Sequence, residues 1–201
     1  VIVHTMMAFQ NHPDIDVICV ACLTGWQDRL WEYARRYNIT KLRHVVPAGA
    51  TGPESIQCGL DELCRHYCDD DIVLIHDGVR PLVNNDIIND CINVATVRGN
   101  AIAAIPCNEV VMTTTDGQES AHSIPRETLR RTQTPHGFHL GEIAELYKLA
   151  RSRGITNIVA SCDLMAALGR PVYFSRGAEK NIKLTTPEDF QIFRAILGAE
   201  K

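Results

Sequence analysis

A short apolar run that passes directly into a polar turn constrains this chain most. Residues 72–75 are Ile, Val, Leu and Ile in succession, which predicts a strand covered on both faces of a parallel sheet. His76-Asp77-Gly78-Val79-Arg80-Pro81 follows at its carboxyl end, where open α/β sheets bind their ligands. The carboxylate of Asp77 and the guanidinium of Arg80 are therefore candidates for holding a metal ion and an anion. The alternative is that the two residues simply cap a turn.

Strand-like and helix-like segments alternate over the first hundred residues. We expect strands at 16–23, 42–46, 70–75 and 101–106, and helices at 1–9, 26–37, 56–63 and 85–97. This order predicts an α/β fold with a mostly parallel sheet flanked by helices. The length allows one domain, residues 1–201, with room for a small arm.

The alternation stops after residue 106. Residues 109–118 predict a strand that runs into the Asp116-Gly117 turn, and residues 122–126 predict its return. Residues 107–128 would then form a β-arm. Because an isolated two-stranded hairpin is marginally stable in water, we expect the arm to lie on a second copy of the chain, which makes a homodimer. Residues 129–138 are polar and predict a turn-like connector.

Small residues fill the loop that precedes the helix expected at 56–63. A glycine such as Gly49 lets the backbone approach a ligand closely, and Ser55 at the helix start can direct its hydroxyl and the helix amides at an anion. Many strand-to-helix turns contain glycine and serine, so this loop alone does not establish a site.

Composition excludes several classes of partner. The net charge is −4 without a run of lysine or arginine, which argues against a nucleic-acid surface. No apolar run reaches the roughly 18 residues needed to cross a bilayer, so we expect a soluble, cytoplasmic protein with no membrane partner. The eight cysteines mostly fall inside apolar patterns and are expected to be reduced thiols. Cys19 and Cys22 share one expected strand and lack two further ligands at zinc-knuckle spacing.

Three separated motifs resemble the CTP-dependent cytidylyltransferases that activate polyol phosphates. The motifs are His76-Asp77-Gly78-Val79-Arg80-Pro81, Arg126 with Thr134-Pro135, and Asn181-Ile182-Lys183-Leu184-Thr185-Thr186-Pro187-Glu188-Asp189. The resemblance implies a Rossmann-like nucleotidyltransferase fold whose protruding β-arm forms the homodimer. It also implies that CTP and a polyol phosphate react, with Mg²⁺ as cofactor, to give a CDP-polyol and pyrophosphate. Attack of a phosphate oxygen on the α-phosphorus builds negative charge, so positioning and cations should carry the catalysis.

The same resemblance implies roles for individual residues. Lys183 and Asp77 would be catalytic, with Asp77 also the metal-binding carboxylate. Arg126 would lie at the base of the arm and reach the phosphate of the substrate that the neighbouring subunit holds. The remaining implied roles are substrate binding by Arg80, Arg126 and Thr134, and CTP binding by Gly49 and Ser55.

The chain also departs from the family pattern. The family begins with a glycine-rich strand-turn that carries an arginine and a lysine, and that segment would lie before Val1. We expect it to be present in the full protein, and we expect no turnover from the 201-residue chain without it. If the protein natively starts at Val1, a non-catalytic binding relic of the fold becomes the better interpretation.

Other positions bear on the substrate. Val110 and Gly52 replace a threonine and an arginine of the methylerythritol-type enzymes, and the acid of the turn before 162–168 is displaced to Asp163. Val79 and the pair Gly25-Trp26 look closer to the ribitol branch. Because isoprenoid synthesis is the commoner use of the fold, methylerythritol 4-phosphate is the favoured acceptor at this point. Ribitol 5-phosphate, which yields CDP-ribitol for cell-surface polymers, is the alternative.

Two other enzyme classes are alternatives to this one. A nucleotide-sugar transferase that uses UTP or GTP on the same fold would bind those nucleotides better than CTP. A dehydrogenase is disfavoured because no G-x-G-x-x-G follows any expected strand.

Overall fold

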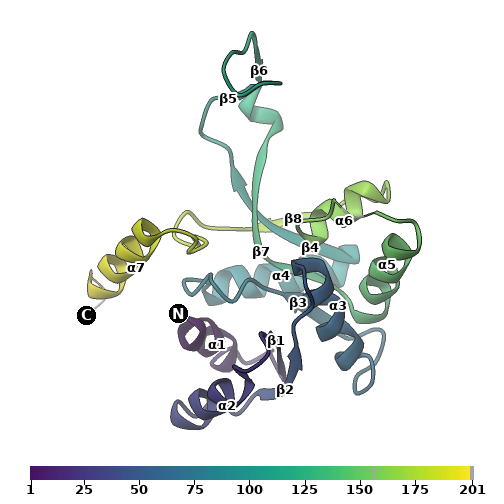
Figure 1. The fold of residues 1–201 in the computed structure, drawn as a ribbon, viewed down its shortest axis with the longest axis vertical. Coiled ribbons are helices and arrows are strands. Elements are labelled where there is room, and N and C mark those ends of the chain that lie inside the picture. The colour runs from purple at the N-terminus through teal and green to yellow at the C-terminus, as the bar shows by residue number, and fades with distance from the viewer. Residues whose placement is uncertain (156, 200–201) are drawn as a thin grey trace.

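A computed structural model describes residues 1–155 and 157–199, and shows a layered α/β body from which a narrow hairpin projects (Figure 1). The helices are α1 (Ile2–Gln10), α2 (Gln27–Arg36), α3 (Gly52–Leu63), α4 (Asn85–Arg98), η1 (Arg126–Thr128), α5 (Leu140–Ser152), α6 (Ser161–Ala167) and α7 (Pro187–Ala199). The strands are β1 (Ile18–Cys22), β2 (Leu42–Pro47), β3 (Ile72–Ile75), β4 (Asn100–Pro106), β5 (Val111–Thr113), β6 (His122–Ile124), β7 (Arg130–His139) and β8 (Phe174–Arg176).

The main sheet has four strands in the order β3-β7-β4-β8. β7 runs antiparallel to both of its neighbours, and β4 and β8 are parallel, so β3, β4 and β8 share one direction. Ile102 and Phe138 face the layer that contains α3 and α5, while Ala101 and Ala103 face α4. The sheet is therefore covered by helices on both sides, as the alternating pattern predicts.

The prediction of a connector at 129–138 was wrong, because all but the first of these residues belong to β7, an inner strand of the sheet. The strand carries a bulge: His136 pairs with Ile102 and Thr132 pairs with Ala104, so three residues of β7 lie opposite one residue of β4. A bulge tolerates a proline that a regular ladder excludes, and it leaves backbone groups free for other partners. Pro135 and its polar neighbours fit this bulge.

β1 and β2 form a separate parallel pair, and a groove lies between this pair and the main sheet. The groove has a volume of about 830 Å³ and is lined along its length by β1 and β3. All four residues of β3 are consequently only half-buried, so the expectation that this strand is covered on both faces was wrong. The open edges of β1 and β3 face the groove.

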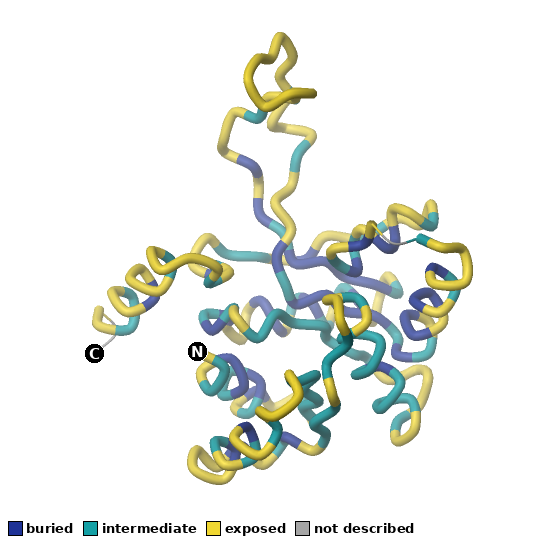
Figure 2. Tube along the Cα trace, viewed as in Figure 1, coloured by how far each residue is buried: buried dark blue, intermediate teal, exposed yellow. Residues whose placement is uncertain are grey.

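The expected arm is present. β5 and β6 pair only with each other, over Val111↔Ile124, Met112↔Ser123 and Thr113↔His122. Figure 2 shows that most of the arm is exposed, whereas buried residues concentrate in the body. The homodimer stays a prediction.

Two smaller expectations can be compared with the structure. All eight cysteines are free thiols, with Cys91 and Cys107 buried and Cys68 exposed. Within residues 1–155 and 157–199, no helix combines the length and apolar character needed to cross a membrane.

Candidate functional site

The turn after β3 brings its carboxylate and guanidinium together. The Arg80 amide donates to the Asp77 carbonyl at 3.0 Å, which closes the turn. The Nε of Arg80 also donates to Asp77 Oδ2 at 3.0 Å, and the Arg80 side chain is only 12% exposed. The pair predicted from sequence therefore forms an enclosed ion pair at the mouth of the groove.

A chain of hydrogen bonds fixes this turn to the bulge of β7. The Asp77 amide donates to Thr134 Oγ1 at 3.0 Å, and this hydroxyl lies 3.1 Å from His76 Nδ1. His76 Nε2 lies 3.1 Å from the carbonyl oxygen of Arg80. Because a carbonyl only accepts, we assign the ring proton to Nε2, so that Nδ1 accepts from Thr134. Burial lowers the pKa of His76 to about 4, which agrees with a neutral ring.

The bulge also holds the segment that follows β8. Gln133 exchanges two hydrogen bonds with the backbone of Ala178, and Asn181 Nδ2 donates to the Thr134 carbonyl at 2.8 Å. Gly177 allows a close approach of two backbones, since a Cβ there would lie 2.9 Å from the carbonyl oxygen of Ala104 and 2.6 Å from Gln133 Oε1. The Gln133 side chain and the Thr134 carbonyl of the bulge thus anchor a segment more than 40 residues away in sequence.

This anchored segment delivers a lysine to the turn. Arg80 Nη1 donates to the Asn181 carbonyl at 2.8 Å, and the Leu184 amide donates to the Val79 carbonyl at 2.9 Å. Between these two bonds, Lys183 places its Nζ 3.3 Å from Asp77 Oδ1. The Lys183 side chain remains 45% exposed, so its ammonium is accessible to a ligand in the groove.

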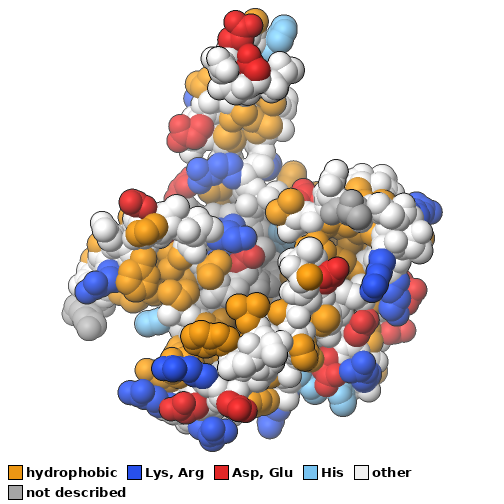
Figure 3. Space-filling view, viewed as in Figure 1, with side chains coloured by type: hydrophobic (Ala, Val, Ile, Leu, Met, Phe, Trp, Pro, Cys, Tyr) orange, Lys and Arg blue, Asp and Glu red, His pale blue; other side chains and the backbone are white. Residues whose placement is uncertain are grey.

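Asp77 is held in its charged form by these two cations. Burial alone would raise the pKa of its carboxyl group, but Lys183 and Arg80 outweigh that effect and keep the pKa below its usual value. Figure 3 shows acidic and basic side chains side by side near the centre of one face, next to a hollow. This arrangement presents positive charge to an anion while a carboxylate orients it.

The groove brings together five of the seven residues that the sequence nominated. Its lining includes Ser55, Asp77, Arg80, Thr134 and Lys183. The Thr134 hydroxyl, however, already accepts from Asp77 and donates to His76, so its contacts in this structure are internal.

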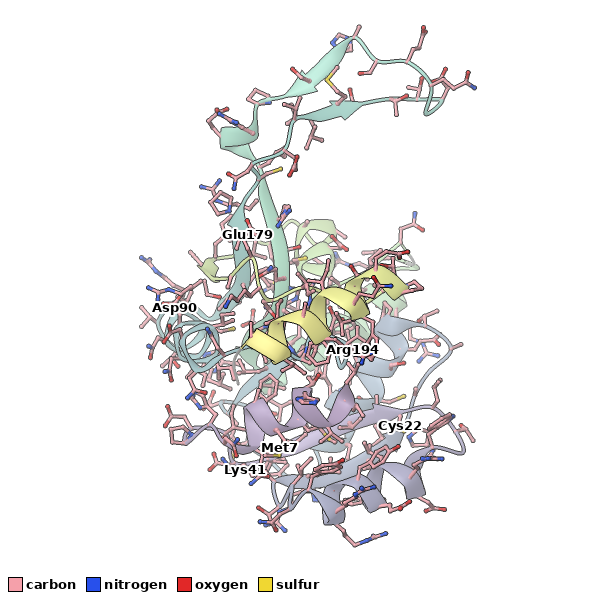
Figure 4. The ribbon with its side chains drawn as sticks, turned by 90° about the vertical axis from the view of Figure 1, so that its left-hand side faces the viewer. Met7, Cys22, Lys41, Asp90, Glu179 and Arg194 are labelled. Atoms are coloured by element: carbon pink, nitrogen blue, oxygen red, sulfur yellow. The ribbon has the colours of Figure 1, made fainter. Side chains whose placement is uncertain are left out.

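The other two nominated residues lie outside the groove lining. Arg126 belongs to η1 at the base of the arm, is 60% exposed, and has a loose contact of 3.6 Å with Glu127. Figure 4 shows the same region from the side, with Glu179 below the arm, where it accepts from Arg131 at 2.6 Å. Gly49 is required for packing, because a Cβ there would overlap Glu54.

The loop before α3 differs from its sequence-based description. α3 begins at Gly52 and not at residue 56, because Thr51 and Glu54 form a capping box. The Glu54 carboxylate accepts from the amides of Ala50 and Thr51, and the Ser55 hydroxyl donates to the Thr51 carbonyl at 2.8 Å. Ser55 therefore lies inside α3 and not at its start, and the loop amides of Ala50 and Thr51 are already occupied by an acidic side chain.

Sequence reasoning missed the residues that support the site. Asn181 lies in one of the three motifs and Gln133 in the stretch 129–138, but neither was assigned a role, and both are buried. His136 is also buried, which lowers its pKa to about 4. The sequence shows amide and imidazole side chains inside a polar stretch. It does not show that they are buried, because their burial depends on the fold of β7.

The residues present fit a magnesium ion held largely by substrate. Asp77 is the carboxylate at this end of the groove, and both of its oxygens contact cations in this structure. Mg²⁺ commonly binds one or two carboxylates together with water and substrate phosphates. A single carboxylate beside the two cations of Arg80 and Lys183 suits that mode.

Comparisons with known proteins agree with this geometry. A family model described as "IspD: 2-C-methyl-D-erythritol 4-phosphate cytidylyltransferase" matches residues 1–199. A ribitol-5-phosphate cytidylyltransferase of Lacticaseibacillus paracasei is 36% identical over 98% of this chain and 85% of that protein. A 2-C-methyl-D-erythritol 4-phosphate cytidylyltransferase of Alkaliphilus metalliredigens is 31% identical over 100% of this chain and 82% of that protein.

A solved structure supports the fold. The crystal structure of 4-diphosphocytidyl-2C-methyl-D-erythritol synthase from Anaerococcus prevotii superposes with a TM-score of 0.86 at 23% identity, covering 98% of this chain and 85% of that one. The nucleotidyltransferase fold implied by the three motifs is thereby confirmed. With a family model matching nearly every residue and relatives above 30% identity, the chain belongs to the 2-C-methyl-D-erythritol 4-phosphate cytidylyltransferase family.

Proposed function

We propose that this protein transfers the cytidylyl group of CTP to ribitol 5-phosphate, which gives CDP-ribitol and pyrophosphate. The ribitol-5-phosphate relative shares 36% identity with the chain, compared with 31% for the methylerythritol relative. Val79 and Gly25-Trp26 also favour the ribitol branch. These observations reverse the preference for methylerythritol 4-phosphate drawn from the frequency of that pathway.

The placement of Lys183 carries the proposal. Its ammonium sits 3.3 Å from Asp77 at the groove, half exposed, in a segment fixed on both sides by backbone hydrogen bonds. An acceptor phosphate oxygen would attack the α-phosphorus of CTP, and the bond to the β-phosphate would break as pyrophosphate leaves. A preorganised cation stabilises the charge that develops on the phosphates during this exchange.

The neighbouring residues have distinct roles in this proposal. Arg80 is locked between Asp77 and the Asn181 carbonyl, so its guanidinium adds fixed positive charge beneath the phosphates. Asp77 orients both cations and would serve as the protein ligand of a magnesium ion, which neutralises phosphate charge when bound. Arg126 would act from the arm on the site of a partner subunit, and Ser55 would lie against the nucleotide.

Pyrophosphate release from the full-length protein tests the proposal. CTP should be used with ribitol 5-phosphate and 2-C-methyl-D-erythritol 4-phosphate in parallel, and UTP and GTP should replace CTP as controls. We expect kcat/KM to be roughly tenfold or more higher for ribitol 5-phosphate. The opposite ratio would assign methylerythritol 4-phosphate, the second candidate. Silence with every acceptor and nucleotide would instead favour a non-catalytic protein.

A further inference from the structure

A second cluster of chemically active side chains, two histidines and a glutamate, lies near the carboxyl end of α3. His44 projects from β2, Glu62 lies in the last turn of α3, and His66 follows in the turn after that helix. Glu62 Oε1 is 3.2 Å from His44 Nδ1 and 3.2 Å from His66 Nε2. The two imidazole rings stack with centroids 4.7 Å apart, and the three ligand atoms all lie within 4.8 Å of one another.

We propose that His44, Glu62 and His66 bind a divalent transition-metal ion of the zinc class. Zinc lies about 2.0–2.2 Å from imidazole nitrogen and carboxylate oxygen, so neighbouring ligands of a tetrahedral ion are roughly 3.3–3.5 Å apart. The two nitrogen–oxygen distances of 3.2 Å are close to that spacing before any ion is bound. Two imidazoles and one carboxylate also form a ligand set suited to zinc, with water in the fourth position.

The surroundings of His44 support coordination through Nδ1. Its other ring nitrogen, Nε2, lies 3.1 Å from the hydroxyl oxygen of Tyr67. A metal-bound imidazole usually donates its second N–H to an oxygen acceptor, which fixes the tautomer and the ring orientation. The hydroxyl oxygen of Tyr67 can accept a hydrogen bond from Nε2–H. The ring proton of His44 can therefore sit on Nε2, which leaves Nδ1 free for the ion.

The carboxylate is also oriented for one-oxygen coordination. Arg65 Nη1 donates to Glu62 Oε2 at 2.6 Å, which leaves Oε1 facing both imidazoles. The Arg65 side chain is 68% exposed, so its charge is largely solvated and weakens cation binding only modestly. His66 is 48% exposed, which gives an ion a route from solvent.

The position of the cluster gives it a structural role separate from nucleotide transfer. Glu62 follows Ser55 by seven residues along α3, which corresponds to about 10 Å of helix. An ion at the cluster would join β2 to the carboxyl end of α3, a helix that borders the groove from Gly52 to Leu63. The ion would therefore act as a clamp on this helix, and it would stabilise the fold in proportion to the occupancy of the site.

The test is a titration of the purified full-length protein with ZnCl₂ and CoCl₂. Calorimetry should give one ion per chain, and saturating zinc should raise the thermal midpoint by roughly 5–10 °C at a hundredfold excess over the dissociation constant. His66→Ala should weaken zinc binding about tenfold or more and abolish the thermal shift. His122→Ala removes an exposed histidine of the arm and is the matched control that should keep both.

Cobalt distinguishes this cluster from the eight cysteines. Coordination by nitrogen and oxygen gives visible cobalt bands without a thiolate charge-transfer band, and His66→Ala should remove those bands. A thiolate band that survives in His66→Ala would place the ion elsewhere and overturn the proposal. Equal zinc affinity in His66→Ala and the unaltered protein, or no binding at millimolar zinc, would also overturn it. None of these readouts depends on CTP turnover.

Discussion

The junction between the β3 turn and the β7 bulge differs from the β5–β6 arm in how it is held. At the junction, Lys183 reaches Asp77 across 106 residues of sequence, and Asn181 reaches Thr134 across 47. In the arm, the hydroxyl of Thr113 contacts the His122 carbonyl across only 9 residues, and the sheet has just two strands. Contacts between distant segments of the same chain therefore hold the junction. The arm is held only by local contacts, so we expect it to need a partner surface for stability.

The largest effect that we expect at the junction is a dependence of the free energy of unfolding on pH, because two of its histidines are buried. Burial lowers the pKa of His76 and His136 to about 4 each, below the value of about 6.5 in an unfolded chain. The unfolded state thus binds more protons between these values, so stability is fully present above pH 6.5 and is lost as pH falls toward 4. We expect a loss of roughly 3 kcal/mol per histidine over this range.

Urea unfolding between pH 7 and pH 5.5 measures the first part of this loss, in a range where ordinary carboxylates stay mostly ionised. Histidine ring signals in NMR spectra provide the residue-level check, because His76 and His136 should stay neutral in the folded protein at pH 5.5. A free energy of unfolding that stays flat over this interval would contradict the assignment of two neutral rings.

Lys183→Gln is the next largest test, and it acts on turnover. Loss of the ammonium removes the accessible cation of the groove, so kcat/KM should fall about 10²–10³-fold. Stability should change by less than about 1 kcal/mol, since the Lys183–Asp77 pair is partly solvated. Lys180→Gln, an exposed lysine of the same segment, is the matched control. Pyrophosphate release near the unaltered rate in Lys183→Gln would remove Lys183 from the proposed mechanism.

Thr134→Val tests whether the link between turn and bulge is structural. Valine keeps the shape but leaves the Asp77 amide and His76 Nδ1 without their partner, which should cost about 1–3 kcal/mol in the free energy of unfolding. Thr134→Ser retains the hydroxyl and should stay much closer to the unaltered protein. Chemical denaturation of the two variants measures the difference. Equal stability would mean that the hydroxyl serves a ligand instead of the fold.

The sequence predicts the parts of the molecule that local patterns determine. Apolar runs located β1 to β4. Asp77 and Arg80 were found together because one turn carries both. Lys183 joined them only through the resemblance to the family, since no local pattern relates two residues so far apart.

The rest depends on contacts between distant segments. β7 looks like a connector because Pro135 and Gly137 are poor strand formers, and its neighbours β3 and β4 override that preference. Burial of His136 follows from that pairing. In the same way, Glu62 and His66 are visibly one helical turn apart, but His44 reaches them only when α3 packs on β2. Non-local packing, which leaves no periodic signal, creates both the site and the second cluster.

The smallest expected effect on stability lies in the arm, where Arg126→Ala should change the free energy of unfolding by less than about 0.5 kcal/mol. Its side chain is 60% exposed and has only the loose contact with Glu127. If Arg126 serves the site of a partner, the variant should still lose turnover, whereas Arg130→Ala, a control at the same end of the arm, should lose less.

Mixing Arg126→Ala with Lys183→Gln then gives mixed dimers in which one of two sites retains both Lys183 and the partner's Arg126. Random exchange should restore roughly a quarter of the unaltered activity. A mixture no more active than the sum of its components would show that Arg126 does not act across subunits, and the arm would then lose its proposed part in the chemistry.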